Sequence, residues 1–146
     1  MRVSTRVEYG LIALTDIVIN SENGESVSAP DIAKRQNISH KYLEHILLLL
    51  RQAGFISAQK GLKGGYVLAC SPDKITLSDV LNALDQNILA DMDTVEDPEA
   101  LGFVINDCFW GKINQSLNRY VQGLKLSEFA NECRNRSSKN WDLYVI

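Results

Sequence analysis

Residues 29–66 contain two short helix patterns and one glycine-rich hairpin pattern in close succession. The first helix opens with Pro30 in its first turn, and the second starts after Ser39 and stops at Gly54. Two β-prone runs then flank a tip that carries Lys and Gly. Two helices joined by a tight turn and followed by a hairpin predict a winged helix-turn-helix. We therefore expect a mainly α fold with a small β-hairpin wing.

Local signals place further elements around this segment. A first helix is expected from near Ser4, a second after the cap Ser28, and a fourth from Thr76 through Leu84, because hydroxyl side chains cap free backbone N–H groups. Strands are expected at 55–58 and 66–69. The remaining helical patterns cover 101–124 and 126–130, with a loose polar stretch at 134–140 and an apolar patch at 141–146.

The chain of 146 residues suits one domain, or a small domain with an oligomerisation arm. We expect a DNA-binding domain at 1–85, an acidic connector with dimerisation helices at 86–134, and a flexible tail at 135–146. No apolar run approaches the roughly 18 residues that a membrane helix needs, which favours a cytoplasmic protein. The long 101–124 helix is expected to pair with its copy in a second subunit, the alternative being packing on its own domain.

Charge is unevenly distributed along the chain. Residues 1–75 carry nine Lys or Arg against seven Asp or Glu, whereas the remainder carries six against eleven. No Lys or Arg lies between Lys74 and Lys112. A polyanion would therefore be attracted to the N-terminal half, although an ordinary solvated basic face accounts equally well for so small an excess.

The start of the third helix carries the polar side chains that a major groove requires. Ser39 can cap the helix or contact a phosphate, and Lys41 can reach guanine or a phosphate. Tyr42 can place its ring on a thymine methyl or its hydroxyl on the backbone. Glu44 can accept from a cytosine amino group, and His40 is either a groove contact or simply an exposed residue.

The hairpin tip adds two cations and three glycines, whose missing Cβ atoms permit close approach to phosphates or entry into a minor groove. Nucleotide binding is disfavoured because the phosphate-loop spacing is absent and the tip lies in a hairpin. Beyond the helix start, the predicted DNA-contacting residues are Arg51, Lys60, Gly61, Lys63, Gly64, Gly65 and Tyr66.

Catalysis is not indicated. The only histidines, His40 and His45, lie on the third helix without a nucleophile or metal-ligand cluster, so we expect no enzyme activity. Cys70, Cys108 and Cys133 are widely spaced, and each is expected to be a small buried apolar residue. A thiol-based redox regulator that uses Cys108 or Cys133 remains an alternative, as does a winged-helix interaction module without DNA binding.

The chain resembles the Rrf2 family of bacterial winged-helix regulators. The resemblance rests on Met1 to Arg6 with Tyr9-Gly10, on Ile38 to Glu44, and on Lys60-Gly61 through Gly64 to Leu68. Val7 departs from the glycine that members often carry. The resemblance implies a homodimeric, sequence-specific DNA-binding regulator, most simply a repressor of a palindromic operator.

Members of the IscR and NsrR types hold an iron–sulfur cluster with three closely spaced cysteines after the wing. Residues 86–107 contain no cysteine and Cys108 stands alone, so we expect no cluster and no cofactor. The chain is more similar to the CymR type, a repressor of cysteine metabolism. That resemblance implies cysteine synthase as a partner, recognised through Tyr144, Val145 and Ile146, with docking of this tail on its own dimer as the alternative.

Overall fold

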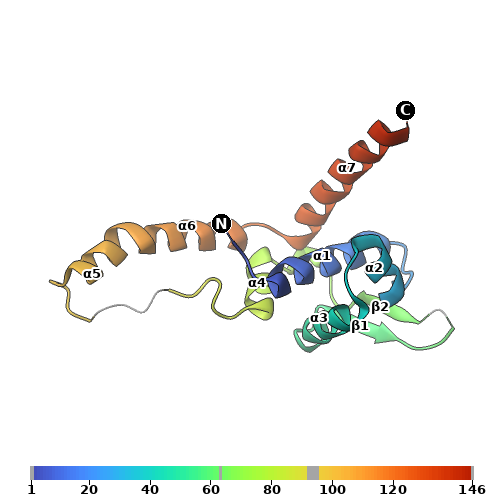
Figure 1. The fold of residues 1–146 in the computed structure, drawn as a ribbon, viewed down its shortest axis with the longest axis horizontal. Helices are drawn as coiled ribbons and strands as arrows, with labels where there is room; N and C mark the ends of the chain where they lie inside the picture. Colours follow the sequence, from blue (N-terminus) through green and yellow to red (C-terminus); the bar gives the residue numbers. More distant parts are fainter. Residues whose placement is uncertain (1, 63, 92–95, 146) are drawn as a thin grey trace.

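The computed structural model describes residues 2–62, 64–91 and 96–145, with side chains described up to residue 137. Helices α1 to α4 and a two-stranded hairpin form a head, here residues 2–89 (Figure 1). A second helical unit, here called the arm, comprises residues 101–122 and projects from the head. Helix α7 leaves the head in another direction (Figure 1). No helix within the described ranges is long and apolar enough to cross a membrane.

Serine caps fix the starts of the first three helices. Ser4 precedes α1 (Thr5–Asn20), Ser28 precedes α2 (Ala29–Gln36), and Ser39 precedes α3 (His40–Gln52). Each serine accepts a hydrogen bond from the backbone N–H three residues later, which satisfies a donor that the helix leaves free. These three predicted helices are confirmed.

The hairpin follows α3 directly. Strand β1 (Ile56–Gln59) pairs antiparallel with β2 (Gly65–Leu68), each shifted by about one residue from the predicted run. Val27 bonds Tyr66 through both backbone groups, at 2.9 and 2.8 Å, and so continues the hairpin on its other edge. The predicted wing is therefore confirmed and is tied to the loop before α2.

Helix α4 (Leu77–Leu84) closes the head. Thr76 and Asp79 form a capping box in which each side chain accepts from the other's backbone N–H, at 3.1 and 2.9 Å. A short 3-10 turn, η1 (Pro72–Lys74), connects the hairpin to this helix. The fully buried side chains of the head come mainly from α1 and α3, where the largest are Leu14, Ile17, Leu43, Ile46, Leu47 and Leu50.

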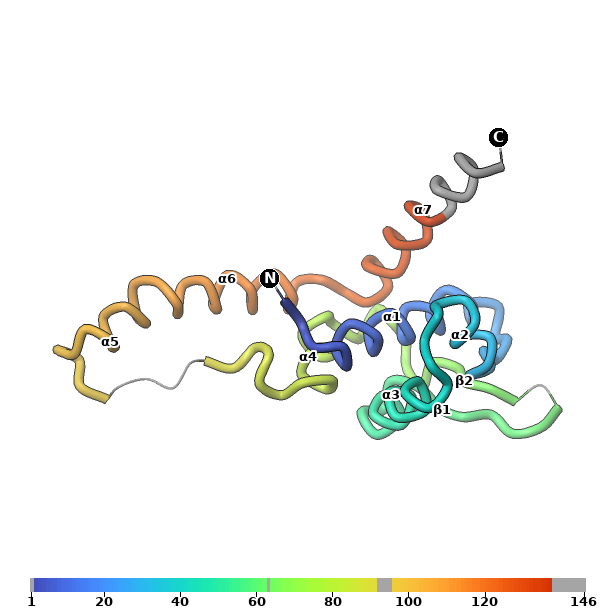
Figure 2. Tube along the Cα trace, in the orientation of Figure 1, coloured from blue at the N-terminus to red at the C-terminus, as the bar shows by residue number. Residues whose placement is uncertain are grey.

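The arm is one continuous helix with an irregular middle. It consists of α5 (Leu101–Ile105), the π-helical segment η2 (Asn106–Trp110) and α6 (Gly111–Gln122). Figure 2 shows the segment that follows α4 running beside α6, with α5 at the far end of the arm. Asn114 and Asn118 donate to the carbonyl of Leu89, each at 3.4 Å, which holds residues beyond α4 along α6. The predicted 101–124 helix is confirmed, but its π-helical segment was not predicted.

Helix α7 (Leu126–Val145) corrects one sequence-based expectation. We expected a short helix over 126–130 and irregular chain after it, and this was wrong because one helix runs on through the polar residues. The polar stretch lacks an apolar period, but residues 126–146 also contain no Gly or Pro to interrupt a helix. The absence of Gly and Pro was the sequence signal that could have predicted the longer helix.

Candidate nucleic-acid interface

The start of α3 is open to solvent. Ser39, His40, Lys41 and Glu44 are all exposed, while Leu43 on the opposite face is completely buried. The Ser39 hydroxyl accepts from the Tyr42 backbone N–H at 3.3 Å, so the cap that starts the helix also lies at its exposed end. A helix N-terminus with exposed polar side chains is the part that a helix-turn-helix presents to the major groove.

Glu44 is paired on the surface of this helix. The Nε2 atom of His40 lies 3.1 Å from Oε1 of Glu44, one helical turn away. Both side chains are more than half exposed, so their interaction contributes little to stability. The pair instead orients Glu44, a predicted base contact, and His40, for which the sequence left open a groove contact or simple exposure.

The Tyr42 side chain packs against the head. It is half buried, and its ring meets that of Tyr9 edge-on, with centroids 5.7 Å apart. Such pairs add to the energy of apolar burial. Tyr42 therefore fixes the start of α3 against α1, a role that the sequence analysis did not assign to it.

The outer face of α3 extends from Lys41 to Arg51. Arg51 is exposed and lies two turns beyond Glu44, so the two residues share a face. His45 and Leu48 are also exposed along this side, with Leu48 retaining 47 % of its surface. Neither was among the predicted contacts, although four consecutive leucines with only one well exposed would have pointed to Leu48.

Figure 1 shows α3 and the hairpin on the same side of the head, away from α7. Lys60, Gly61 and Leu62 are exposed at the hairpin tip. Gly61 has a φ of +119°, which only glycine adopts readily, and the Gly64 N–H closes the turn onto the Gly61 carbonyl at 2.9 Å. Lys63, the other predicted cation, lies outside the described residues.

Gly65 and Tyr66 serve the architecture of the hairpin. A Cβ on Gly65 would lie 2.6 Å from the Val27 carbonyl oxygen, so any larger residue would separate the hairpin from the loop before α2. Tyr66 is half buried and packs against the core. Gly65 therefore permits a close backbone approach within the protein, and its predicted contact with DNA stays a prediction.

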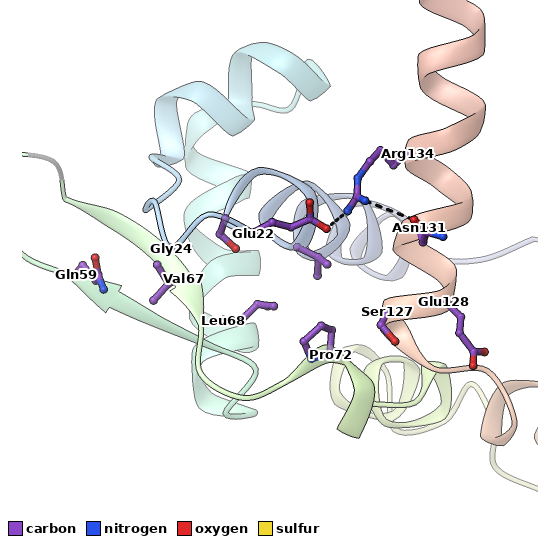
Figure 3. Close-up of a pocket in the computed structure, with 12 residues that line it drawn as sticks. Glu22, Gly24, Gln59, Val67, Leu68, Pro72, Ser127, Glu128, Asn131 and Arg134 are labelled. Atoms are coloured by element: carbon purple, nitrogen blue, oxygen red, sulfur yellow. Dashed lines mark hydrogen bonds and ion pairs between the residues drawn. The ribbon is translucent and has the colours of Figure 1, made fainter.

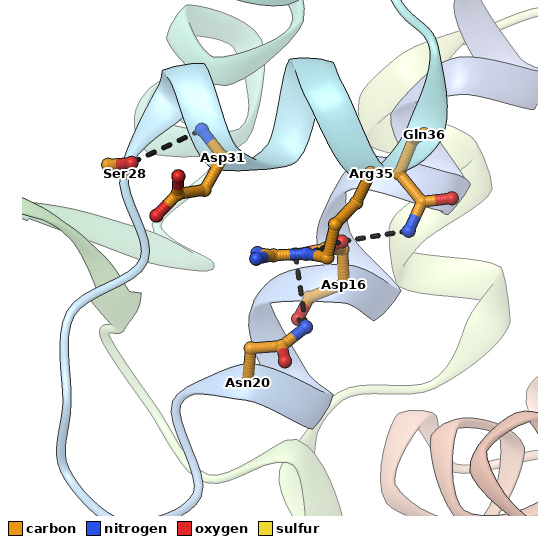
Figure 4. Close-up of polar contacts among 6 residues, drawn as sticks. All are labelled: Asp16, Asn20, Ser28, Asp31, Arg35 and Gln36. Carbon is orange, nitrogen blue, oxygen red and sulfur yellow. Dashed lines mark hydrogen bonds and ion pairs between the residues drawn. The ribbon is translucent and has the colours of Figure 1, made fainter. Parts of the chain in front are cut away.

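A buried carboxylate anchors α2 to α1. The Asp16 side chain has no solvent exposure and accepts from Arg35 through both Nε and Nη2, at 3.0 and 2.9 Å. Gln36 donates a third hydrogen bond to this carboxylate at 2.8 Å. Asn20, on the same helix as Asp16, donates a fourth at 3.3 Å (Figure 4). These contacts fix the angle between the first helix of the motif and the rest of the head.

The same carboxylate raises the pKa of Arg35, chiefly through the hydrogen bond and against the effect of burial. A bidentate arginine–carboxylate pair is specific in geometry as well as in charge. Sequence reasoning missed this pair because its members are 19 residues apart and no local spacing connects them. The apolar pattern of α1 offered one signal, since Asp16 interrupts its buried face.

The cysteines differ from expectation. Cys70 and Cys108 are exposed and Cys133 is half buried, so the prediction of buried apolar cysteines was wrong for the first two. Cys70 follows the hairpin, and Cys108 lies in the π-helical segment of the arm. Burial raises the pKa of the Cys133 thiol, with Glu132 adding to the effect.

The tail residues predicted to bind a partner are only partly described. Tyr144 and Val145 belong to the helical backbone of α7, and nothing further is described of their side chains. Ile146 lies outside the described residues. The predicted role of these three residues in binding a partner therefore stays a prediction.

An exposed, serine-capped third helix beside a glycine-closed hairpin defines a winged helix-turn-helix regulator. Residues 3–132 match the Rrf2 family profile, described as an iron-dependent transcriptional regulator. The chain belongs to this family of DNA-binding transcription regulators.

Three similar proteins illustrate the relationship. Protein rrf2 of Nitratidesulfovibrio vulgaris is 33 % identical over 130 residues, covering 88 % of this chain and 86 % of that protein. The solved structure of CymR (YrzC), the global cysteine regulator of B. subtilis, matches with a TM-score of 0.78 and 28 % identity over 90 % of this chain and 98 % of that one. The structure of T. potens IscR matches with a TM-score of 0.73 and 26 % identity, over 91 % and 88 %.

The family description raises the question of iron. Among the described residues, no three His, Cys, Asp or Glu side chains are grouped so that they could hold a metal ion. Cys70 follows the hairpin, Cys108 lies in η2 and Cys133 in α7, whereas a cluster requires several thiolates together. The described donor set does not fit an iron–sulfur cluster.

Proposed function

We propose that the protein is a homodimeric repressor that binds a palindromic operator in the bacterial cytoplasm. The observation that carries this proposal is the exposed, capped start of α3 on the same side of the head as the hairpin tip. One surface can then place the helix in a major groove and the tip on the adjacent backbone or minor groove. Half-sites about 34–36 Å apart would match one helical turn of DNA.

Within this interface the side chains have different tasks. Lys41 and Glu44 are assigned to base edges, with His40 beside them, and Ser39 and Arg51 to phosphates. Lys60 and Lys63 are assigned to the backbone near the wing. The structural roles of Tyr42, Gly65 and Tyr66 support this set, and Gly61 and Gly64 shape the tip.

The DNA proposal is tested by footprinting and by salt dependence. Lys60→Ala should weaken binding to all sequences and reduce the slope of log K against log salt by about 0.9, because one phosphate contact is lost. Lys41→Ala should weaken binding and relax discrimination at one base position. Lys112→Ala on the arm is the matched control and should change neither. Protection without dyad symmetry, or an unchanged slope for Lys60→Ala, would contradict the proposal.

The domain boundaries proposed from sequence fit a division of labour between DNA binding at 1–85, dimerisation at 86–134 and a tail at 135–146. The arm supports the dimer because it leaves large apolar side chains uncovered: Leu101, Val104, Ile105, Phe109, Trp110, Ile113 and Tyr120 are between 39 and 73 % exposed. A surface of this kind is typical of a protein interface. We propose that a second copy of the chain covers this apolar surface of the arm.

Analytical ultracentrifugation tests this dimer. Ile113→Asp should shift the protein toward monomer, since a charge would have to be buried in the interface. Leu62→Asp makes the same kind of change at the exposed hairpin tip and should leave the association unchanged. If Ile113→Asp remains as dimeric as the wild type, the arm is not the interface.

A regulatory partner is proposed from the resemblance. The likeness to a protein titled the global cysteine regulator supports a link to sulfur metabolism, with cysteine synthase binding Tyr144 to Ile146. Since the α7 backbone is helical through Val145, an extended peptide mode would require its last turn to unwind. Purified cysteine synthase should bind the chain and lose affinity when Ile146 is deleted; equal affinity would reject this contact.

A further inference from the structure

A cleft lies between the strands of the wing and α7. It is open to solvent, has a volume of about 850 Å³, and is lined by the end of α1, the loop after it, both strands, η1 and α7 (Figure 3). Segments from both ends of the chain therefore meet around one space. The volume is within the range of small-molecule sites, roughly 300–1,000 Å³.

The floor of the cleft is apolar. Val18 is buried, and Val67, Leu68 and Pro72 are half buried where they line it. These side chains come from α1, β2 and η1, so an apolar group resting on them would contact three elements together. An aliphatic or thioether side chain fits this surface, since its burial removes apolar area from water.

The rim carries charges of both signs. Arg134 of α7 pairs with Glu22 of the loop after α1, and it also donates to Oδ1 of Asn131 at 3.4 Å (Figure 3). Glu128 and Ser127 lie on the same side of the cleft. The side chains of Arg134 and Glu22 retain 33 and 50 % of their surface, so water and solutes reach both partners.

An exposed ion pair above an apolar floor is complementary to a small zwitterion. An α-amino acid could insert into the pair with its carboxylate on the Arg134 guanidinium and its ammonium on the Glu22 carboxylate. Both protein charges would keep a partner, whereas a simple anion would leave Glu22 unpaired and a simple cation would leave Arg134 unpaired. We propose that this cleft binds a free α-amino acid with a neutral, apolar side chain.

Occupancy of the cleft would connect α7 to the wing. The ion pair is one of the ties between α7 and the head, and the floor includes Val67 and Leu68 of the strand that carries the hairpin tip. A bound amino acid would increase the distance between Glu22 and Arg134 and would contact β2 through Val67 and Leu68. This regulatory consequence rests on the proposed DNA-binding function, whereas the binding site itself does not.

Calorimetry with the full chain tests the site without DNA. L-leucine should bind, whereas 4-methylpentanoate, which lacks the ammonium, and 3-methylbutylamine, which lacks the carboxylate, should bind about tenfold more weakly or not at all. L-valine and L-methionine extend the test to other apolar side chains, and L-aspartate and L-lysine to charged ones. No heat from any of the three apolar amino acids, or equal affinity for L-leucine and its two analogues, would overturn the proposal.

Matched variants locate the binding. Arg134→Gln and Glu22→Gln remove opposite partners of the same pair, and each should weaken L-leucine binding about tenfold. Arg136→Gln is the control, because Arg136 lies on the same helix and pairs at 2.7 Å with Glu132, away from the cleft. Circular dichroism verifies the helix content of each variant. Unchanged affinity in both Arg134→Gln and Glu22→Gln would place the amino acid elsewhere and reject the cleft.

A separate measurement tests the regulatory role of the cleft. Operator binding is measured with and without saturating L-leucine, and a change in affinity that Arg134→Gln abolishes would support the coupling. If L-leucine binds as described but operator affinity does not change, the site stands and its regulatory role is rejected. If no operator is bound at all, the proposed DNA function fails while the calorimetric result remains valid.

Discussion

The head and the arm treat apolar side chains in opposite ways. In the head, Leu14, Ile17 and Ile46 have no solvent exposure, whereas in the arm Leu101 and Tyr120 retain 73 and 67 % of their surface. The head buries most of its large apolar residues, with Leu48 and Leu62 among the exposed exceptions, whereas the described residues of the arm leave seven large apolar side chains exposed. The difference fits the proposal that one protomer suffices for the winged-helix fold, while the arm pairs with a second copy.

The sharpest test of this comparison makes the same substitution in both regions. Ile46→Ala should lower the free energy of unfolding by about 2–5 kcal/mol, because it removes buried methyl groups and leaves a cavity. Ile113→Ala, at a side chain that is 50 % exposed, should cost the isolated protomer less than about 1 kcal/mol. Urea unfolding followed by circular dichroism at low protein concentration measures both values.

Concentration separates the two regions further. If a second copy covers the arm, the stability lost in Ile113→Ala should grow as protein concentration rises, while that of Ile46→Ala should stay constant. Equal losses at high dilution would show that Ile113 is buried within a single protomer in solution. The contrast between head and arm would then be lost.

The next effect concerns the anchor between α1 and α2. Arg35→Met should cost about 2–3 kcal/mol, since it leaves the buried Asp16 carboxylate without its cation. This is below the cost for a fully buried pair, because solvent reaches the 40 % exposed Arg35 side chain. Lys34→Met, at an exposed neighbour, is the control and should be near neutral. Chemical denaturation gives both values, and a neutral Arg35→Met would mean that Gln36 and Asn20 satisfy the carboxylate alone.

The π-helical segment determines which arm residues share a face. In an uninterrupted α-helix, Ile105 and Ile113 would lie about 80° apart and Leu101 and Tyr120 about 100° apart. One extra residue in the segment reduces these angles to about 20° and about 0°. The irregular turn therefore aligns the apolar residues of α5 with those of α6 into a single stripe.

Gly111 makes this alignment possible and provides its test. A Cβ at Gly111 would lie 2.7 Å from the Asn106 carbonyl oxygen, the group to which the Gly111 N–H bonds across the segment. Gly111→Ala should therefore disfavour the π turn and weaken dimerisation by about tenfold, or 1.4 kcal/mol. Gly123→Ala, whose Cβ would lie 3.4 Å from Arg119 O, should have no such effect. Sedimentation equilibrium distinguishes them, and equal dimer affinity would show that the stripe is not the interface.

Local chemistry explains what could be predicted from the sequence. The caps Ser28 and Ser39 and the stop at Gly54 act within a few residues, so they located the helices of the motif correctly. The Asp16–Arg35 anchor and the cleft beside Arg134 could not be found in this way, because they join residues far apart in the chain. The length of α7 was missed because a helix of polar residues has no apolar period. The π turn was missed because a lone glycine does not reveal that its N–H bonds a carbonyl five residues back.

The same limit applies to the predicted DNA contacts. Exposed polar residues such as Lys41 follow directly from the helix pattern. Tyr42 and Tyr66, two of the predicted DNA contacts, also pack against the head, and their contacts with DNA stay predictions. Whether an aromatic side chain faces solvent or a neighbouring helix depends on packing that is set elsewhere in the fold.

The smallest expected effect is a difference in cysteine reactivity. The thiolate is the reactive form, and burial raises the pKa of Cys133, so less of this thiol is ionised near neutral pH. Iodoacetamide should therefore modify Cys133 several-fold more slowly than the exposed Cys70, with its rate continuing to rise at higher pH. Mass spectrometry of digested samples measures each site, and labelling in denaturant should make the two rates similar. Equal rates in the folded protein would contradict the described burial.

Cys108 brings this measurement back to the comparison between head and arm. It is exposed on the arm of a single protomer, next to the uncovered Phe109 and three residues after the uncovered Ile105. If a second copy covers the arm, its labelling should slow as protein concentration rises, while that of Cys70 in the head should not change. Ile113→Asp should remove this dependence by dissociating the dimer. If Cys108 is labelled rapidly at every protein concentration, no second copy covers the apolar stripe. If it is labelled slowly even at high dilution, the protomer itself shields the arm.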